Sequence, residues 1–302
     1  MTFTTTEYPP QPFYVAPEKI QKDTLLALPS DMHSGGSTAL FPHYRDLQDG
    51  FWQFKHTRYV PSGKQCDLAD HWDYCADQLA IARMGKRLII VGMGDMTDGK
   101  HHDTLQLATH NPDEQMDVNI WLMQRFMKRV GFDRSRGDKF YVLSGTETHT
   151  KDKEDLIAKE LQAENNPEGT EIFDFLPLDI NGKLFWFLHQ GAGPGKGANI
   201  GNALVNWMKN KYFELLEAGE RIPDAVISGH YHVPVYTTFT RNYRTMHGVI
   251  LPSWQFKTRF GYKVAAAERE NIGLTTIDVS AGGNILVNKP YLLAKRDEVI
   301  YT

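Results

Sequence analysis

The stretch DAVISGHYH, residues 224–232, places a short apolar run directly before two histidines. Four other short apolar runs are also followed closely by side chains that can bind a metal ion, and they cover residues 24–30, 87–94, 139–145 and 183–190. Short apolar runs bounded by glycine and polar residues are typical of buried β-strands. Because ligands gather at the carboxyl ends of strands in open α/β sheets, we expect these strand ends to lie together.

The segments between and after these runs indicate a layered α/β protein. Amphipathic segments predict helices near residues 66–84, 113–130, 151–164 and 199–218, and short β-rich runs occupy residues 235–240, 246–251, 274–279 and 284–288. The closing series of strands predicts a second, mixed sheet packed against the first. Residues 1–20 are rich in Thr and Pro and predict an extended arm, followed by a single domain over residues 21–302.

Composition excludes several classes of protein. The chain has 302 residues, of which 41% are hydrophobic and 23% charged, as in ordinary globular proteins. It has no apolar run approaching the roughly 18 residues of a membrane helix, so we expect no membrane partner. The first residues lack a basic segment followed by an apolar one, so a cytoplasmic location is expected by default. A net charge of −4 argues against non-specific nucleic-acid binding over the whole surface, but allows a local basic groove.

The polar residues after the strand runs are those that transition metals prefer. In chain order they are Asp31 and His33, Asp95, Thr146 with Glu147 and His149, His189, and finally His230 and His232. Imidazole with carboxylate, and without thiolate, suits Mn, Fe, Co, Ni or Zn better than a dedicated Mg or Ca site. The i, i+2 spacing of each Asp/His or His/His pair places both side chains on one side of an extended backbone. A carboxylate such as Asp95 can also bridge two cations.

In this order the blocks resemble those of the calcineurin-like metallophosphoesterases. That family has Asp-x-His, Gly-Asp-x-x-Asp, Gly-Asn-His-Asp/Glu, a lone His after a strand, and Gly-His-x-His. The corresponding blocks here are Asp31-Met32-His33, Gly94-Asp95-Met96-Thr97-Asp98, Gly145-Thr146-Glu147-Thr148-His149, His189 and Gly229-His230-Tyr231-His232. The third block also loosely resembles Gly-Thr-x-x-His blocks in phosphoesterase-like proteins of bacteriophages and prophages. The resemblance covers about residues 25–233 and implies a four-layer α-β-β-α sandwich of two mixed sheets.

The resemblance further implies two divalent transition-metal ions, which would be Mn, Fe, Ni, Co or Zn. One ion would be held by Asp31, His33, Asp95 and His232, and the other by Asp95, His189, His230 and one further oxygen. The asparagine that supplies this oxygen in the family is missing, and Thr146 takes its nominal place. Because a carboxylate binds a divalent ion more strongly than a neutral hydroxyl does, we expect Glu147 to replace it.

The function implied is hydrolysis of a phosphate ester by a bridging hydroxide that attacks phosphorus in line. Asp95 would act by bridging the ions, and His149 would protonate or stabilise the departing oxygen. Trp254, Lys257 and Arg259 combine an aromatic ring with cations, which could stack a base and hold a phosphate. A phosphodiester, nucleotide or nucleic-acid substrate is therefore favoured. The alternatives are a phosphomonoesterase or protein phosphatase, and a non-catalytic metal-binding interaction scaffold. For the Trp254–Arg259 run itself, the preferred interpretation is core packing of the aromatics with solvated charges.

Three further features have two interpretations each. Asp98 could orient a metal ligand or be a turn residue before Gly99, and His101, His102 and Asp103 could reach substrate or lie in an exposed loop. The run 191–201 is rich in glycine but does not match the Walker pattern, because Gly197 follows Lys196 where Ser or Thr is required. We expect it to be a loop that leads into a helix.

Overall fold

The computed structural model describes residues 21–43, 45–48, 56–99, 106–150, 153–259, 261, 263 and 270–293. The predicted arm, residues 1–20, and the loop residues His101, His102 and Asp103 lie outside the described residues. The division into an arm and one domain over residues 21–302 therefore stays a prediction.

The first sheet carries the strands that lead to Asp31 and Asp95. It is six-stranded, with the order β12-β11-β1-β4-β5 and with β13 paired to β11. Strands β4 and β5 continue the sheet in parallel to β1, whereas β11 runs antiparallel to β1. The strands are β1 (Thr24–Leu28), β4 (Arg87–Gly92), β5 (Lys139–Val142), β11 (Gly273–Val279), β12 (Ile285–Val287) and β13 (Tyr291–Leu292).

The second sheet is five-stranded and is also mixed, with the order β6-β7-β8-β10-β9. Its central strands β7, β8 and β10 are parallel, and the outer pairs β6–β7 and β9–β10 are antiparallel. The strands are β6 (Phe175–Ile180), β7 (Lys183–Leu188), β8 (Ala225–Ser228), β9 (Val235–Arg241) and β10 (Arg244–Ile250). A separate hairpin is formed by β2 (Arg45–Gln48) and β3 (His56–Tyr59).

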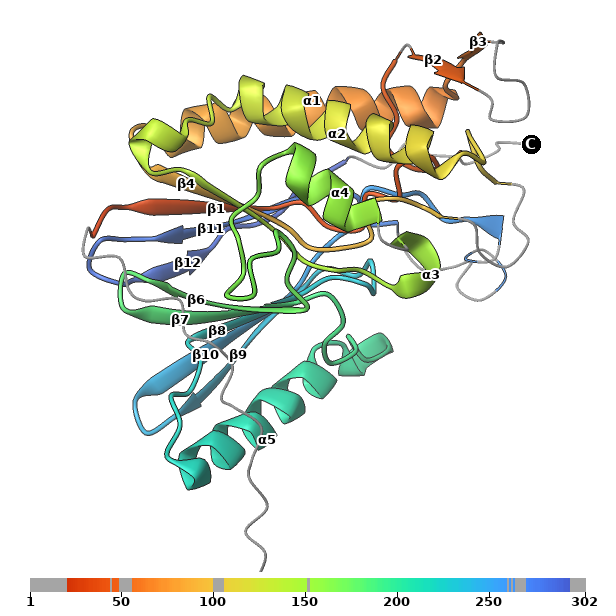
Figure 1. Cartoon of the computed structure of the whole chain (residues 1–302). Helices are drawn as coiled ribbons and strands as arrows, with labels where there is room; N and C mark the ends of the chain where they lie inside the picture. The colour runs from red at the N-terminus through yellow and green to blue at the C-terminus, as the bar shows by residue number, and fades with distance from the viewer. Residues whose placement is uncertain are drawn as a thin grey trace, which may run out of the picture.

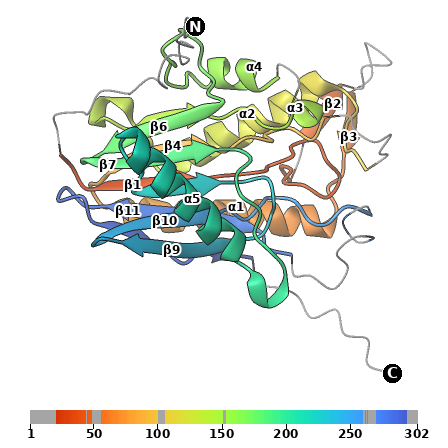
Figure 2. The ribbon, with the colours of Figure 1, turned by 90° about the horizontal axis from the view of Figure 1, so that it is seen from below.

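Helices cover the outer face of each sheet (Figure 1). Helices α1 (Gly63–Arg83), α2 (Pro112–Arg129) and α4 (Lys153–Glu160) lie on the first sheet, and α5 (Asn202–Ala218) lies across the second (Figure 2). The short elements are α3 (Glu147–Thr150), η1 (Arg134–Arg136) and η2 (Gly197–Asn199). Among the helices in the described part of the chain, none combines the length and apolar character needed to cross a membrane.

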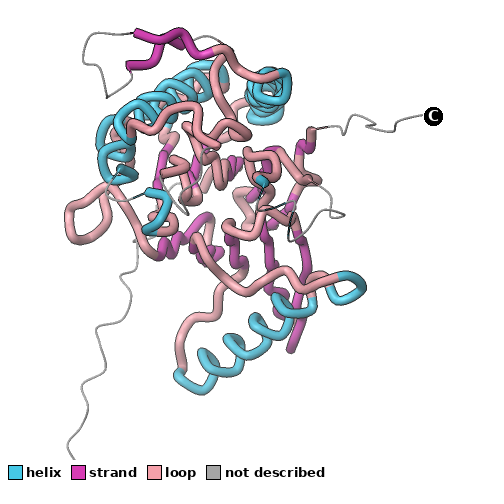
Figure 3. The backbone as a smooth tube through the Cα atoms, turned by 90° about the vertical axis from the view of Figure 1, so that its right-hand side faces the viewer, coloured by secondary structure: helices cyan, strands magenta, loops and turns pink. Residues whose placement is uncertain are grey.

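Three apolar layers separate these elements, and the alternation of side chains along β1 shows how. Leu25 and Ala27 pack with the residues of α1 and α2, whereas Leu26 and Leu28 pack against the second sheet. A third layer joins the second sheet to α5 through residues such as Met208. Successive residues of a strand point to opposite faces, so a strand buried on both sides is apolar throughout. The expected four-layer α-β-β-α sandwich of two mixed sheets is thereby confirmed (Figure 3).

The closing strands differ from the prediction. They do not form the second sheet by themselves: β9 and β10 join β6, β7 and β8, while β11, β12 and β13 return to the first sheet. Strand β11 pairs with every residue of β1, from Thr24 to Leu28. It therefore covers the edge of β1 that would otherwise be unpaired. The sequence did not indicate β6, because Pro177 interrupts its alternating pattern; as an edge strand, β6 tolerates the proline.

Candidate metal centre

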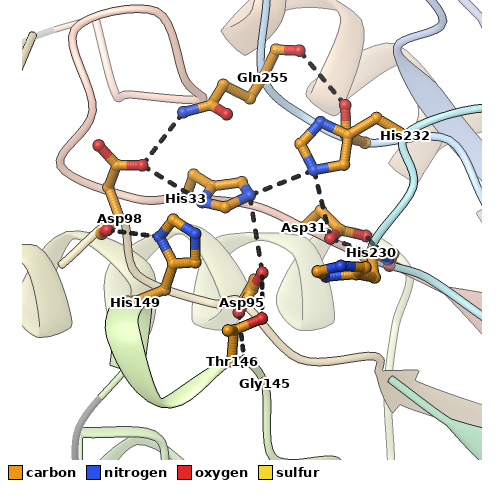
Figure 4. A network of polar contacts seen from close by, with 12 residues as sticks. Asp31, His33, Asp95, Asp98, Gly145, Thr146, His149, His230, His232 and Gln255 are labelled. Carbon is orange, nitrogen blue, oxygen red and sulfur yellow. Dashed lines mark hydrogen bonds and ion pairs between the residues drawn. The ribbon is translucent and has the colours of Figure 1, made fainter. Parts of the chain in front are cut away.

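The polar residues that follow β1, β4, β5, β7 and β8 converge on one cluster, although these strands belong to two sheets. Figure 4 labels those that follow β1, β4, β5 and β8. The two sheets pack face to face, and their parallel strands end on the same side of the molecule (Figure 1). Backbone hydrogen bonds hold the loops after β1 and β4 together: the N–H of His33 donates to the carbonyl of Asp95 at 2.9 Å, and that of Asp31 to the carbonyl of Gly94 at 3.1 Å. Main-chain contacts therefore hold the loop of Asp31 and His33 against that of Asp95.

The backbone of this cluster has an unusual conformation. Asp31, His33, Asp95, His230 and His232 all have positive φ angles, between 45° and 70°. A non-glycine residue in this left-handed region costs on the order of 1–2 kcal/mol, and such residues concentrate at functional sites. The expectation that Asp31/His33 and His230/His232 face the same way along an extended backbone is therefore wrong. Their side chains converge because each residue turns the chain.

Three groups of side chains present ligand atoms close enough to share a cation. They are Asp31 with His33 and His232, His33 with Asp95 and His149, and Asp95 with His189 and His230. In the first, Nε2 of His232 lies 3.3 Å from both Nε2 of His33 and Oδ1 of Asp31. In the third, Nε2 of His189 lies 3.2 Å from Oδ2 of Asp95. Asp95 belongs to two of the groups, so its carboxylate connects them.

The imidazole rings are oriented from behind by oxygen atoms. Nδ1 of His189 lies 2.7 Å from the carbonyl oxygen of Met93, and Nδ1 of His149 lies 2.8 Å from that of Asp98. A carbonyl oxygen can only accept, so Nδ1 carries the proton and, in the neutral ring, Nε2 keeps its lone pair for the cluster. Nδ1 of His33 lies 3.2 Å from Oδ1 of Asp98. Histidines that bind metal are oriented by their other ring nitrogen in this way.

The charges of the cluster favour a cation. Asp31 and Asp95 are almost fully buried, at 0% and 2% exposure. Burial by itself raises the pKa of the Asp31 carboxyl, but neighbouring His232 and His189 outweigh it, and the net shift is downward. The pKa of Asp95 is likewise lowered by His189 and His33 against the effect of burial. Asp95 in turn raises the pKa of His189 to about 9, although burial opposes this. Two buried carboxylates thus stay ionised and require positive charge beside them, which divalent cations would provide.

The third block is arranged differently from the expectation. Glu147 is exposed at the start of α3 and, among the described residues, is in none of the three groups. The backbone N–H of Thr146 donates to Oδ1 of Asp95 at 2.7 Å, and its hydroxyl lies 3.4 Å from Nε2 of His189. The hydroxyl of Thr146, not the carboxylate of Glu147, therefore faces the third group, that of Asp95, His189 and His230. His149 reaches the cluster, with its ring centroid 4.8 Å from that of His33.

The predicted substrate-binding residues do not all lie at the site. Trp254 is fully buried and packs edge-to-face on Trp72 with ring centroids 4.6 Å apart, so it offers no face to a substrate. The structure thus places the Trp254 ring in the core, as the core-packing interpretation of this run expects. Lys257 is half-buried and Arg259 exposed, and their roles stay predictions. Two residues before Lys257, Gln255 donates from Nε2 to Oδ1 of Asp98 at 3.2 Å (Figure 4).

Two residues that support the cluster were not indicated by the sequence. Asn119 of α2 donates from Nδ2 to the carbonyl of Met96 at 2.9 Å and to Oγ of Ser34 at 3.0 Å. Glu154 of α4 accepts hydrogen bonds from the backbone of the loops after β4 and β5. The only available signal was a polar residue among the apolar positions of an amphipathic helix.

Comparisons with known proteins find only distant structural similarities. No family model matches the sequence, and no curated protein matches it. Among solved structures, a Streptococcus pneumoniae protein described as a predicted phosphoesterase has a TM-score of 0.33 at 8% identity, over 89% of this chain and 99% of that one. The Thermus thermophilus sulfate thiohydrolase SoxB has a TM-score of 0.39 at 14% identity, over 92% of this chain but 58% of its own. The Thermotoga maritima protein TM1076 has a TM-score of 0.35 at 13% identity, over 88% and 98%.

Proposed function

We propose that this chain is a metal-dependent phosphoesterase in which two cations share the carboxylate of Asp95. The observation that carries the proposal is that Asp95 belongs to one ligand group with His33 and His149 and to another with His189 and His230. His33 in turn belongs to the group of Asp31 and His232. On this proposal the ligands of one ion are Asp31, His33, Asp95 and His232, and those of the other are Asp95, His189 and His230, with the hydroxyl of Thr146 beside them. The family resemblance of the sequence supports the same partition.

The charge of such a centre suits a phosphate ester. Divalent cations held there would neutralise the phosphoryl oxygens and lower the pKa of the water that serves as nucleophile. Two divalent cations carry more charge than the two carboxylates Asp31 and Asp95 can offset. An anionic substrate would therefore find surplus positive charge at the cluster.

His149 is placed to handle a proton. Its Nδ1 donates to the carbonyl oxygen of Asp98, at 2.8 Å, which fixes the ring and leaves Nε2 on the side of the cluster. We propose that Nε2 holds a proton for the departing oxygen of the substrate. General acids positioned in this manner contribute roughly 10²–10⁴-fold to rate.

The substrate class is proposed to be a phosphodiester or nucleotide. Lys257 and Arg259 follow Gln255, whose amide contacts Asp98 behind the cluster, so their cations lie on the segment that leaves the site. They could hold a second phosphate oxygen or a phosphate chain. Trp254 takes no part, since its ring is in the core.

The test is hydrolysis of bis-(p-nitrophenyl) phosphate and p-nitrophenyl phosphate after metal is stripped with chelator and Mn²⁺ or Ni²⁺ is restored. Elemental analysis of the loaded protein should give two metal ions per chain. Diester turnover that is lost in Asp95→Asn would support the proposal and exclude a contaminating phosphatase. Turnover of the monoester alone would indicate a phosphomonoesterase. Bound metal without turnover of either would indicate a non-catalytic scaffold.

A further inference from the structure

A buried carboxylate lies behind the cluster, on the first turn of α4. Glu154 is 2% exposed. Its Oε1 accepts a hydrogen bond from the backbone N–H of Met96 at 3.0 Å, and its Oε2 accepts one from that of Gly145 at 2.5 Å. Met96 follows Asp95 in the loop after β4, and Gly145 precedes Thr146 in the loop after β5. One side chain therefore joins the two loops that carry the shared ligand and the third block.

Burying this carboxylate is costly. Burial raises the pKa of Glu154 from its ordinary value of 4.5 to about 7, although the two backbone hydrogen bonds act in the opposite direction. An apolar side chain at this position, next to the buried Ile157 and Ala158 on the same helix, would avoid that cost. What the carboxylate adds is two acceptors, each directed at a backbone N–H of a different loop.

The two loops are in direct backbone contact, so small displacements matter. A Cβ atom added to Gly145 would lie 2.2 Å from the backbone nitrogen of Asp95 and 2.4 Å from its Oδ1, which no side chain could occupy. Thr146 also donates its N–H to Oδ1 of Asp95 at 2.7 Å. Any change in the spacing of the loops would therefore move the carboxylate of Asp95 relative to its histidine neighbours.

We infer that Glu154 is a positioning residue that clamps the loops after β4 and β5 and thereby sets the geometry of Asp95 in both ligand groups. Its effect on metal affinity rests on the proposed function, whereas the clamp itself rests only on the hydrogen bonds. Both oxygens are required. A glutamine has the same size but only one acceptor oxygen, and it would turn an N–H₂ group toward one of the two backbone donors.

The experiment compares Glu154→Gln with a matched control, Asp224→Asn. Asp224 is also a buried carboxylate, at 8% exposure, that accepts a backbone hydrogen bond, from Leu184 at 2.9 Å. It precedes β8, so it lies at the opposite end of the strand that leads to His230. The control thus makes the same change of carboxylate to amide away from the two loops, and it also weakens the ion pairs of Asp224 with Lys183 and Arg244.

Two quantities are measured on each full-length variant: the Mn²⁺ dissociation constant of the stripped protein, and hydrogen exchange of the amides of Met96 and Gly145 without metal. For Glu154→Gln we expect faster exchange at both amides and about 10–100-fold weaker Mn²⁺ binding, the usual cost of losing a residue that orients ligands. For Asp224→Asn we expect the exchange rates of the two amides and the Mn²⁺ dissociation constant to match those of wild type. If Glu154→Gln does not fold, Glu154→Asp, which is too short to reach both donors, is measured in the same way.

The outcomes separate the two proposals. Unchanged exchange in a folded Glu154 variant, or unchanged Mn²⁺ affinity, would overturn the positioning role. Equal weakening in Asp224→Asn would also overturn it, because the effect would then be general destabilisation. Wild-type protein that binds neither Mn²⁺ nor Ni²⁺ would refute the proposed function and the link to metal affinity, while the exchange data would still decide whether Glu154 clamps the loops.

Discussion

Nε2 of His189 lies 3.2 Å from Oδ2 of Asp95, while Nδ1 of the same ring lies 2.7 Å from the carbonyl oxygen of Met93. Because Met93 belongs to the loop that also carries Asp95, the imidazole and the carboxylate are fixed to the same stretch of backbone. The position of the His189 ring relative to the carboxylate of Asp95 is therefore set by this stretch of backbone.

Asp95→Asn should lower the rate of phosphoester turnover by several orders of magnitude and should also lower the metal content, because the variant removes charge from both ligand groups. Activity is measured on the chromogenic diester, metal content by elemental analysis, and folding by circular dichroism. A folded variant that keeps more than a tenth of the wild-type rate would contradict the shared role, since a factor of ten corresponds to only about 1.4 kcal/mol of barrier.

Glu147→Ala should leave metal content and turnover close to wild type, because the side chain is exposed and lies outside the ligand groups.

His149→Ala should keep both metal ions and slow turnover by roughly 10²–10⁴-fold, as expected for a residue that handles a proton. The two variants lie two residues apart, so each is a control for the other. Metal lost in His149→Ala would make that histidine a ligand, and metal lost in Glu147→Ala would return the carboxylate to the site.

The sequence predicted the layers and most of the cluster, because both depend on local patterns. Apolar runs such as residues 87–94 identify strands buried on both faces, and side chains at strand ends converge whenever the strands are parallel. Two features could not be predicted from the sequence. The positive φ angles of Asp31 and His33 depend on hydrogen bonds to the loop after β4, which is distant in sequence. Likewise, Glu154 lies on the same helix face as Ile157 and Ala158, but this local pattern does not show which backbone groups its carboxylate contacts.

Trp254→Ala should destabilise the protein by about 3–5 kcal/mol, because the ring fills the core beside Trp72 and its loss leaves a cavity. Unfolding in urea measures this. Trp254→Phe keeps an aromatic ring at that position and serves as the control; it should retain the wild-type KM for the diester. A raised KM in a stable Trp254→Phe variant would contradict the core assignment and restore the ring to substrate binding.

The stability of the metal-free protein should depend on pH through Glu154. Its pKa is raised in the folded chain, from 4.5 to about 7, so the folded state binds this proton more tightly than the unfolded state does. The resulting stabilisation is complete below about pH 4.5 and is lost as the pH rises through about 7. We therefore expect the unfolding free energy of wild type, relative to that of Glu154→Gln, to fall between pH 5 and pH 8, since the amide does not titrate. Urea unfolding with chelator present, at both pH values, measures the difference. A constant difference between the two proteins would show that Glu154 does not titrate in this range, whereas a rising difference would show that its carboxylate form is the one favoured by folding.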